Sequence, residues 1–173
     1  MSTGVRPARS ADAGAIARAH ATAWRETYTG MLPQAMVDGL TIDEAHDRWA
    51  AKTAPNSGTG VFVAEADGAV VGFAAGCPAM DPDMGTGGVL DFLYIVKAGQ
   101  GMGFGRALTE AVGADLYGQG FADMGVVVHA DNPAREFYRV MGAMEVVERF
   151  RDHRGFDCPE VLLRWDLPLS SAS

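Results

Sequence analysis

The sequence predicts an α+β domain with a mixed, mainly antiparallel sheet of about six or seven strands, flanked by about four helices. Three observations predict it. Helix-forming stretches come first in the chain. An Asp-Gly pair then joins two apolar runs, as in an antiparallel hairpin. Two further apolar runs, residues 89–96 and 124–129, flank a helix-forming stretch, so we expect them to be parallel, buried neighbours.

The first part of the chain is predicted to be mostly helical. An edge strand at residues 5–7 precedes a helix over residues 13–27, which Ser10 or Asp12 can cap. A second helical piece begins at Gln34. Thr41 and Glu44 resemble a capping box, which predicts a helix over residues 42–52.

The remaining elements alternate between strands and helices. The hairpin pairs residues 61–65 with residues 69–74. The strand at residues 89–96 is followed by a helix to about residue 117, and the strand at residues 124–129 by a helix that Pro133 starts. Residues 144–147 and 159–166 are predicted to form a final antiparallel pair.

Length, charge and cysteine content limit the possible functions. The 173 residues have the length of one domain, and the net charge of −8 argues against a nucleic-acid binder. Cys77 and Cys158 show no metal-ligand spacing, so we expect free thiols and no metal. The N-terminal stretch has no apolar signal core, and no segment approaches about 18 apolar residues. We therefore expect a cytoplasmic protein with no membrane partner.

The loop after residues 89–96 carries glycine at alternate positions: Gly99, Gly101, Gly103 and Gly105. Glycine permits positive φ and lets a ligand approach the backbone closely. The next helix begins near Arg106, and free N–H groups at a helix start favour an anion. The loop is therefore predicted to bind phosphate; the alternative is a flexible turn.

Two phosphate-loop patterns fail here. A Walker loop ends in Gly-Lys-Ser/Thr, whereas Gly105 is followed by Arg106 and Ala107. A dinucleotide fingerprint would need glycine at Arg106 or at Phe104, and an acid at the end of the next strand, where Asp123 lies at its start instead. The pattern that fits is Gln-x-x-Gly-x-Gly, formed by Gln100, Gly103 and Gly105.

This loop resembles the acyl-CoA pyrophosphate loop of the GNAT N-acetyltransferase superfamily. The run Leu93-Tyr94-Ile95 resembles the end of that family's fourth strand, and the run from Asn132 to Tyr138 resembles its motif of Asn, Ala and Phe-Tyr. The stretch from Ala23 to Pro33 also resembles a segment of one GNAT branch. Gln100 departs from the commoner arginine, and Ala143 from the usual phenylalanine.

The resemblance implies the GNAT fold and direct acetyl transfer from acetyl-CoA to a primary amine. In the family, the fourth and fifth strands splay at a β-bulge, and unpaired backbone groups, here at Leu93 and Ile95, hold the pantetheine arm. The Ile95 N–H is then expected to meet the developing oxyanion. The remaining expected cofactor contacts are Gln100, Gly101, Met102, Gly103, Phe104, Gly105, Arg106, Asn132, Arg135 and Tyr138. Asn132 is alternatively a plain N-cap and Arg135 a solvated helix residue.

Tyr138 and Asp91 are the candidate proton carriers. By resemblance, Tyr138 is the general acid that protonates the leaving thiolate; alternatively it is a core aromatic. A primary ammonium must lose a proton before it attacks, and Asp91, four residues before Ile95, is expected on the same strand face unless a bulge shifts the phase. Glu65 and His129 are rival bases.

The acceptor is a small amine or a peptide amine that the sequence does not identify. Trp24, Tyr28, Met31 and Met84 are candidates to line its pocket, with helix packing as the alternative for the two aromatics. The acidic chain favours a cationic amine. The resemblance also implies a homodimer. Two alternatives remain open: a non-catalytic acyl-CoA-sensing or protein-interaction module, and an enzyme that acts on a protein or charged tRNA.

Overall fold

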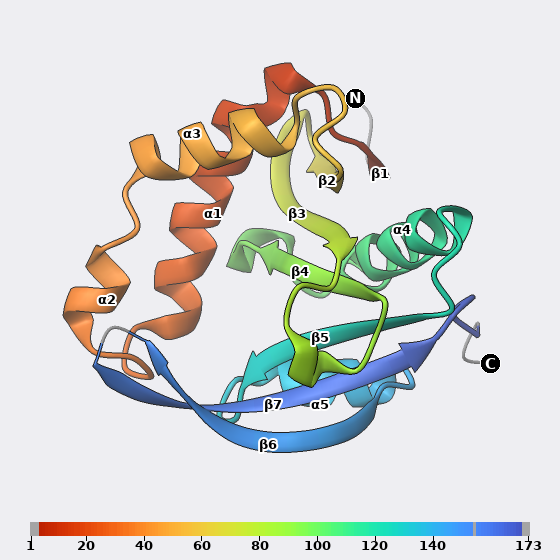
Figure 1. Cartoon of the computed structure of the whole chain (residues 1–173). Helices are drawn as coiled ribbons and strands as arrows, with labels where there is room; N and C mark the ends of the chain where they lie inside the picture. The colour runs from red at the N-terminus through yellow and green to blue at the C-terminus, as the bar shows by residue number, and fades with distance from the viewer. Residues whose placement is uncertain (1–3, 154, 171–173) are drawn as a thin grey trace.

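The computed structural model describes residues 4–153 and 155–170 and contains one seven-stranded sheet with helices on both faces (Figure 1). The strands are β1 (Gly4–Pro7), β2 (Gly60–Ala66), β3 (Ala69–Pro78), β4 (Gly88–Ile95), β5 (Asp123–His129), β6 (Met144–His153) and β7 (Phe156–Asp166). The α-helices of the described residues are α1 (Ala13–Tyr28), α2 (Gln34–Asp38), α3 (Ile42–Lys52), α4 (Phe104–Gly118) and α5 (Ala134–Val140).

The strand order is β1-β2-β3-β4-β5-β7-β6. Every neighbouring pair is antiparallel except β4 and β5, which are parallel and joined through α4. This confirms the predicted α+β fold with one parallel pair. None of the helices in the described part of the chain is long and apolar enough to cross a membrane.

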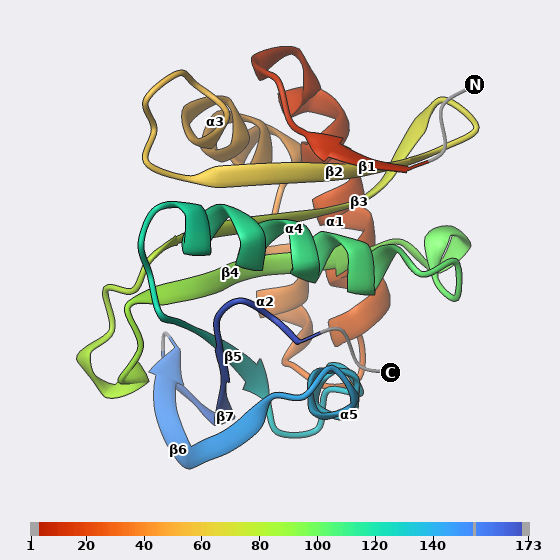
Figure 2. The same ribbon diagram turned by 90° about the vertical axis from the view of Figure 1, so that its right-hand side faces the viewer.

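The helices divide between the two faces of the sheet (Figure 2). On one face, α4 buries a stripe of residues four apart: Phe104, Leu108, Val112 and Leu116. This spacing places them on one side of a helix. On the other face, α1 and α3 pack against the sheet, with Ile16 and Trp49 fully buried.

Two local sequence signals are confirmed, one in a turn and one in a helix cap, whereas the Asp12 side chain forms no capping hydrogen bond to α1. Asp67 and Gly68 both have positive φ, as a two-residue hairpin turn requires. Thr41 accepts from the Glu44 backbone N–H at 3.2 Å, and Glu44 accepts in turn from the Thr41 N–H at 3.3 Å. This reciprocal capping box starts α3 where the sequence predicted it.

The last two strands are longer than predicted. Strand β6 extends to His153 and β7 begins at Phe156, whereas the prediction covered only residues 144–147 and 159–166. Residues 148–153 were missed because they carry mostly charged side chains, without the apolar alternation of a half-buried strand. Strand β6 lies at the sheet edge and is exposed along most of its length. This extension adds charged residues to the site described next.

Candidate active site

Strands β4 and β5 pair only at one end. The parallel ladder joins Gly88 to Met124 and Val89 to Gly125. Beyond this point β4 contains a bulge: Leu90 pairs with Gly76 of β3, and Phe92 pairs with Ala75. Asp91 is the extra residue between them. A bulge of this kind bends the strand, and here it lies where β4 leaves β5.

The splay leaves backbone groups of β4 without a strand partner. The Val96 N–H donates to the Val71 carbonyl at 2.9 Å. Because alternate residues of an antiparallel strand direct their N–H and C=O to the same neighbour, those of Leu93 and Ile95 point away from β3 and into the gap beside β5. The Gln100 side-chain amide donates to the Ile95 carbonyl at 3.0 Å. The Ile95 N–H therefore remains available to a ligand.

The glycine loop follows directly and ends at the start of α4. Gly101 and Gly103 have φ of +76° and +82°, which favour glycine. Gly103 is the N-cap residue and has no side chain to satisfy the first helical N–H groups. A Cβ at Gly105 would lie 3.2 Å from the Phe137 ring. The loop thus presents free amides and a positive helix end to an anion.

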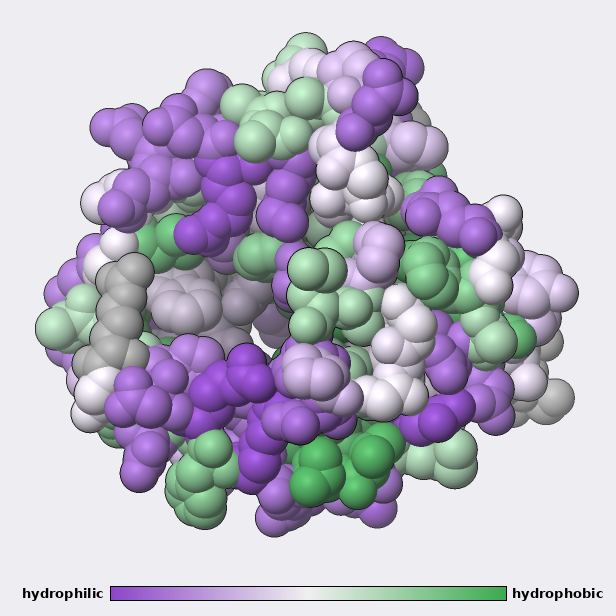
Figure 3. Space-filling model, viewed as in Figure 1, coloured by the Kyte–Doolittle hydropathy of each residue, from purple (hydrophilic) through white to green (hydrophobic). Residues whose placement is uncertain are grey.

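A cavity of about 690 Å³ connects the splay to the glycine loop. Most of the predicted cofactor residues line it: Leu93, Ile95, Gln100, Gly101, Gly103, Gly105, Arg106, Asn132 and Tyr138. Tyr28 and Asp91 line it as well. Figure 3 shows the molecule hollowed between α1 and the β6–β7 pair. The two strands and the loop therefore border one cavity.

Tyr138 comes from α5 and is 5% exposed. Burial, with a smaller contribution from the neighbouring Tyr28, raises its pKa well above the ordinary tyrosine value. Its ring packs edge-on against Trp165 at 5.6 Å between centroids. The hydroxyl therefore stays protonated at neutral pH, so it can donate a proton or a hydrogen bond.

Two more tyrosines lie beside Tyr138. Burial raises the pKa of Tyr28, while hydrogen bonding with Tyr94 and Asn132 opposes the rise. Tyr94 has a pKa raised well above its ordinary value by burial and by Tyr28. The Asn132 side-chain oxygen also accepts from the Ala134 N–H at 2.9 Å, so it caps α5. The sequence analysis had not assigned the Tyr94 side chain, because its contact with Tyr28 depends on how α1 docks.

Asp91 lies on the opposite strand face from the one expected. Leu93 and Ile95 pack toward α4, whereas Asp91 reaches Lys52 of α3 on the other side of the sheet. The bulge shifts the phase, so the expectation that Asp91 and Ile95 share a face is wrong. Asp91 nevertheless lines the cavity at the splay. Its role as a base stays a prediction.

The rival bases lie elsewhere. Glu65 accepts from Arg6 at 2.5 Å in an ion pair that also includes Asp12. His129 is 7% exposed, and its Nδ1 accepts from the Asp131 N–H at 3.1 Å, as a capping contact. Neither lines the cavity.

The side chains of three predicted cofactor contacts lie outside the cavity at the splay. Arg135 binds Glu145 at 2.7 Å and Glu148 at 2.6 Å, so its guanidinium is engaged on β6 and lies outside the cavity. The Phe104 side chain belongs to the core under α4. Met102 is exposed and does not line the cavity. None of the three contributes a side chain to the cavity. For Arg135 this corrects the assignment, whereas the contacts expected from the loop backbone at Met102 and Phe104 stay predictions.

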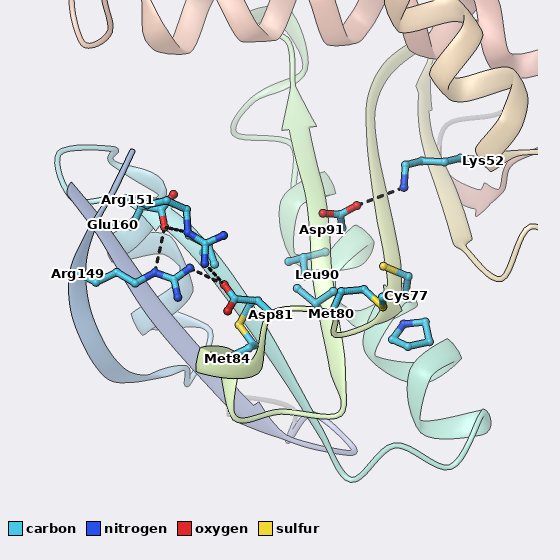
Figure 4. Close-up of a pocket in the computed structure, with 13 residues that line it drawn as sticks. Lys52, Cys77, Met80, Asp81, Met84, Leu90, Asp91, Arg149, Arg151 and Glu160 are labelled. Carbon is cyan, nitrogen blue, oxygen red and sulfur yellow. Dashed lines mark hydrogen bonds and ion pairs between the residues drawn. The ribbon is translucent and has the colours of Figure 1, made fainter. Parts of the chain in front are cut away.

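The predicted acceptor residues are separated. The Trp24 indole donates to the Val37 carbonyl at 3.1 Å and packs between helices. Trp24 and Met31 line neither the cavity at the splay nor a second one of about 420 Å³, so both are dropped from the acceptor pocket. Met84 lines this second cavity (Figure 4).

The second cavity contains charged residues that the sequence did not single out. They are Lys52, Asp81, Arg149, Arg151 and Glu160. No local motif marks them, because they come from α3, the loop after β3, β6 and β7. Sequence analysis could have found the arginines only by recognising the full length of β6.

Three potential metal ligands meet next to this cavity. The ligand atoms of His153, Cys158 and Glu160 lie within 4.8 Å of one another. Arg149 Nε already binds one Glu160 oxygen at 3.2 Å, and His153 binds the other at 2.7 Å. Burial and the Glu160 charge raise the pKa of the Cys158 thiol, which disfavours the thiolate a metal needs. We assign no metal to this cluster.

Comparison with known proteins agrees with this geometry. The model of the Acetyltransferase (GNAT) family matches residues 21–143. The uncharacterized N-acetyltransferase YuaI of Bacillus subtilis (strain 168) is 33% identical over 162 residues, covering 93% of this chain and 91% of that protein. The relative therefore matches along nearly the whole length of both chains.

Solved structures share the fold. A GCN5-related N-acetyltransferase from Rhodopseudomonas palustris superposes with a TM-score of 0.74 at 21% identity, covering 96% of this chain and 97% of that one. The structure of yncA from Salmonella typhimurium, which contains its cofactor acetyl-CoA, gives 0.72 at 18% identity, covering 100% and 98%. At these identities the likeness concerns the arrangement of strands and helices.

Proposed function

Because the chain belongs to the GNAT acetyltransferase family, we propose that it transfers an acetyl group from acetyl-CoA directly to a primary amine. One observation supports this proposal above the others. The unpaired backbone of β4 at Leu93 and Ile95 adjoins the glycine loop within one cavity of about 690 Å³. Such a cavity suits a long ligand with an acyl-bearing arm at one end and phosphates at the other.

The proposed donor binding uses mostly backbone groups. The pyrophosphate would lie on the amides from Gln100 to Arg106, and the pantetheine arm along Leu93 and Ile95. The Ile95 N–H would donate to the oxyanion that forms on the thioester carbonyl. Removing one donor of this kind from an enzyme costs about 2.7–4 kcal/mol of transition-state stabilisation.

The proposed transfer forms a C–N bond and breaks the C–S bond of the thioester. The ammonium, with a reference pKa of about 10.4, first loses a proton, and Asp91 would take it, through water or directly. Tyr138, kept protonated by burial, would donate a proton to the departing thiolate of CoA. Tyr28 and Asn132 would position the arm at the splay.

Calorimetry and a thiol assay together test the proposal. We expect acetyl-CoA and CoA to bind, and a panel of small amines to include at least one that releases free CoA thiol. If neither CoA species binds while ATP or NAD does, the donor assignment is wrong. Binding without thiol release from any amine would instead favour a non-catalytic acyl-CoA-sensing or interaction module.

We also propose that the protein is a cytoplasmic homodimer. Strand β6 is an edge strand, and four of its apolar side chains are exposed: Met144, Val146, Val147 and Phe150. Two β6 strands can pair antiparallel along this free edge, so that exposed apolar side chains of one copy cover those of the other. Such an edge-to-edge contact uses the same strand in both copies, which favours a second copy of the chain as the partner.

A further inference from the structure

The cavity of about 420 Å³ lies next to the proposed donor site, and the two share Leu90, Asp91 and Val127 among their lining residues. An acceptor in this cavity would therefore meet the thioester at the splay. We propose that the acceptor is a small amine that also carries a carboxylate, with its nitrogen at Asp91 and its carboxylate at Arg151. This inference rests on the proposed acetyl transfer and names its acceptor class.

One wall of the cavity provides the contact for the amine. Lys52 Nζ lies 3.3 Å from Asp91 Oδ2 and covers that oxygen (Figure 4). Among the described residues, Asp91 Oδ1 has no hydrogen-bond partner. The Asp91 side chain is 39% exposed, so this oxygen can receive an N–H from a bound amine.

The opposite wall holds two arginines, Arg149 and Arg151, that differ in the number of ion pairs they form with neighbouring carboxylates. Arg149 binds Asp81 at 2.6 Å, Asp83 at 3.2 Å and Glu160 at 3.2 Å, one contact for each of its nitrogens. Each Arg149 nitrogen thus already has a carboxylate partner, and the Arg149 side chain is only 15% exposed.

Arg151 is less engaged. Its Nη2 binds Asp81 at 2.6 Å and its Nε lies 3.9 Å from Glu160, while Nη1 has no partner among the described residues. The Arg151 side chain is 43% exposed. Nη1 can therefore donate to one oxygen of a bound carboxylate in a charge-assisted hydrogen bond.

The overall charge of the lining disfavours a polyamine. Three cations, Lys52, Arg149 and Arg151, balance three carboxylates, Asp81, Asp91 and Glu160. A purely cationic acceptor would be repelled by the arginines on one side of the cavity. The net negative charge of the whole chain had favoured such an acceptor in the sequence analysis. An acceptor with one positive and one negative end matches the two walls.

The residues between the walls are apolar. Met84 and Leu90 are buried, and Val89 and Val127 also line this part of the cavity. They offer no partner for a third charged group. The volume is at the lower end of the range for small-molecule sites, which favours a ligand of amino-acid size.

The test compares paired amines that differ only in a carboxylate: lysine with cadaverine, phenylalanine with phenethylamine, and ornithine with putrescine. Thiol release gives kcat/KM for each, and we expect the carboxylate-bearing member to be at least tenfold better in at least one pair. Arg151→Gln should lower this ratio about tenfold, through a higher KM for the carboxylate-bearing member and little change in its kcat.

Arg139→Gln is the matched control. Arg139 is 59% exposed on α5, outside both cavities, and its replacement should leave the ratio as in the wild type. Preference for the decarboxylated amines, or an equal loss for both members with Arg151→Gln, would overturn the inference while leaving acetyl transfer intact. No thiol release from any amine would count against the proposed function itself.

Discussion

Lys52 and Asp91 join helix α3 to the bulge of β4, with Lys52 Nζ 3.3 Å from Asp91 Oδ2. The same lysine lies 5.4 Å from the centroid of the Phe92 ring. This pair orients the only carboxylate that lines both cavities in the described part of the chain. Its position at the junction supports Asp91 as the acceptor of the amine proton, although the reason is not the strand alternation used in the sequence analysis.

Replacement of Asp91 tests this role. We expect Asp91→Asn to lower kcat and to move the pH–rate profile to higher pH, because the amine must then be deprotonated by solvent. The measurement is thiol release over a range of pH at saturating acetyl-CoA. Asp47→Asn, at a side chain 91% exposed on α3, is the control. A profile at the same pH as the wild type would make Asp91 structural.

Removal of the Tyr138 hydroxyl should affect turnover more than donor binding. For Tyr138→Phe we expect kcat to fall by about 10²-fold, the lower end of the usual range for a general acid, with acetyl-CoA affinity nearly unchanged. Single-turnover thiol release and calorimetry measure the two quantities. Tyr117→Phe, on the exposed part of α4, is the control. Wild-type turnover in Tyr138→Phe would remove this residue from the mechanism.

Alanine substitutions of two glycines, one at each end of α4, can distinguish an effect on donor binding from an effect on stability. Gly103 and Gly120 have φ of +82° and +95°, and a Cβ at either would meet nothing within 4 Å. Alanine should cost each site about 1–2 kcal/mol of unfolding free energy through backbone strain. Only Gly103→Ala should also weaken acetyl-CoA binding. Equal affinities in the two variants would argue against pyrophosphate at the loop.

His20 should make stability depend on pH. It is 2% exposed, its Nδ1 accepts from the Trp49 indole at 3.1 Å, and burial, followed by Arg48, lowers its pKa to about 4. In the unfolded chain the His20 ring binds a proton near pH 6.5, whereas in the folded chain it does so only near pH 4. The free energy of unfolding therefore falls as the pH falls from 6.5 towards 4. We expect a loss of about 2 kcal/mol between about pH 7 and pH 5.

Denaturant titrations at both pH values measure this loss. It should shrink in His20→Asn and persist in His46→Asn, because His46 is half exposed on α3. An NMR titration of the wild-type His20 ring gives an independent check. A ring that titrates near pH 6.5 in the folded protein would refute the prediction.

The proposed dimer depends on the exposed edge of β6. Phe150 is 74% exposed there, and Phe150→Glu would place a charge from each copy in the contact between the two β6 strands. We expect light scattering to report a dimer for the wild type and a monomer for this variant. Tyr117→Glu, at a side chain 52% exposed on α4, should leave the mass unchanged. A monomeric wild type would disprove the assembly.

Local signals in the sequence predicted the backbone features of the proposed donor side. The glycine loop, the start of α4 and the cap at Asn132 each involve only a few consecutive residues. Positive φ, a missing side chain or a capping hydrogen bond sets their backbone conformation, whatever packs around them. The hairpin turn at Asp67 and Gly68 was predictable for the same reason.

The acceptor side was decided by tertiary structure. The bulge at Asp91 arises from the register between β3 and β4, and no local pattern in the sequence predicts that register. Arg135 was assigned to phosphates because its motif is local, but β6 brings Glu145 and Glu148 against it. Arg151 and Lys52 face one cavity from elements about 100 residues apart. Such contacts depend on how whole elements dock. The sequence alone therefore determined the local backbone of the proposed donor site, and only the folded sheet decided which charges line the proposed acceptor cavity.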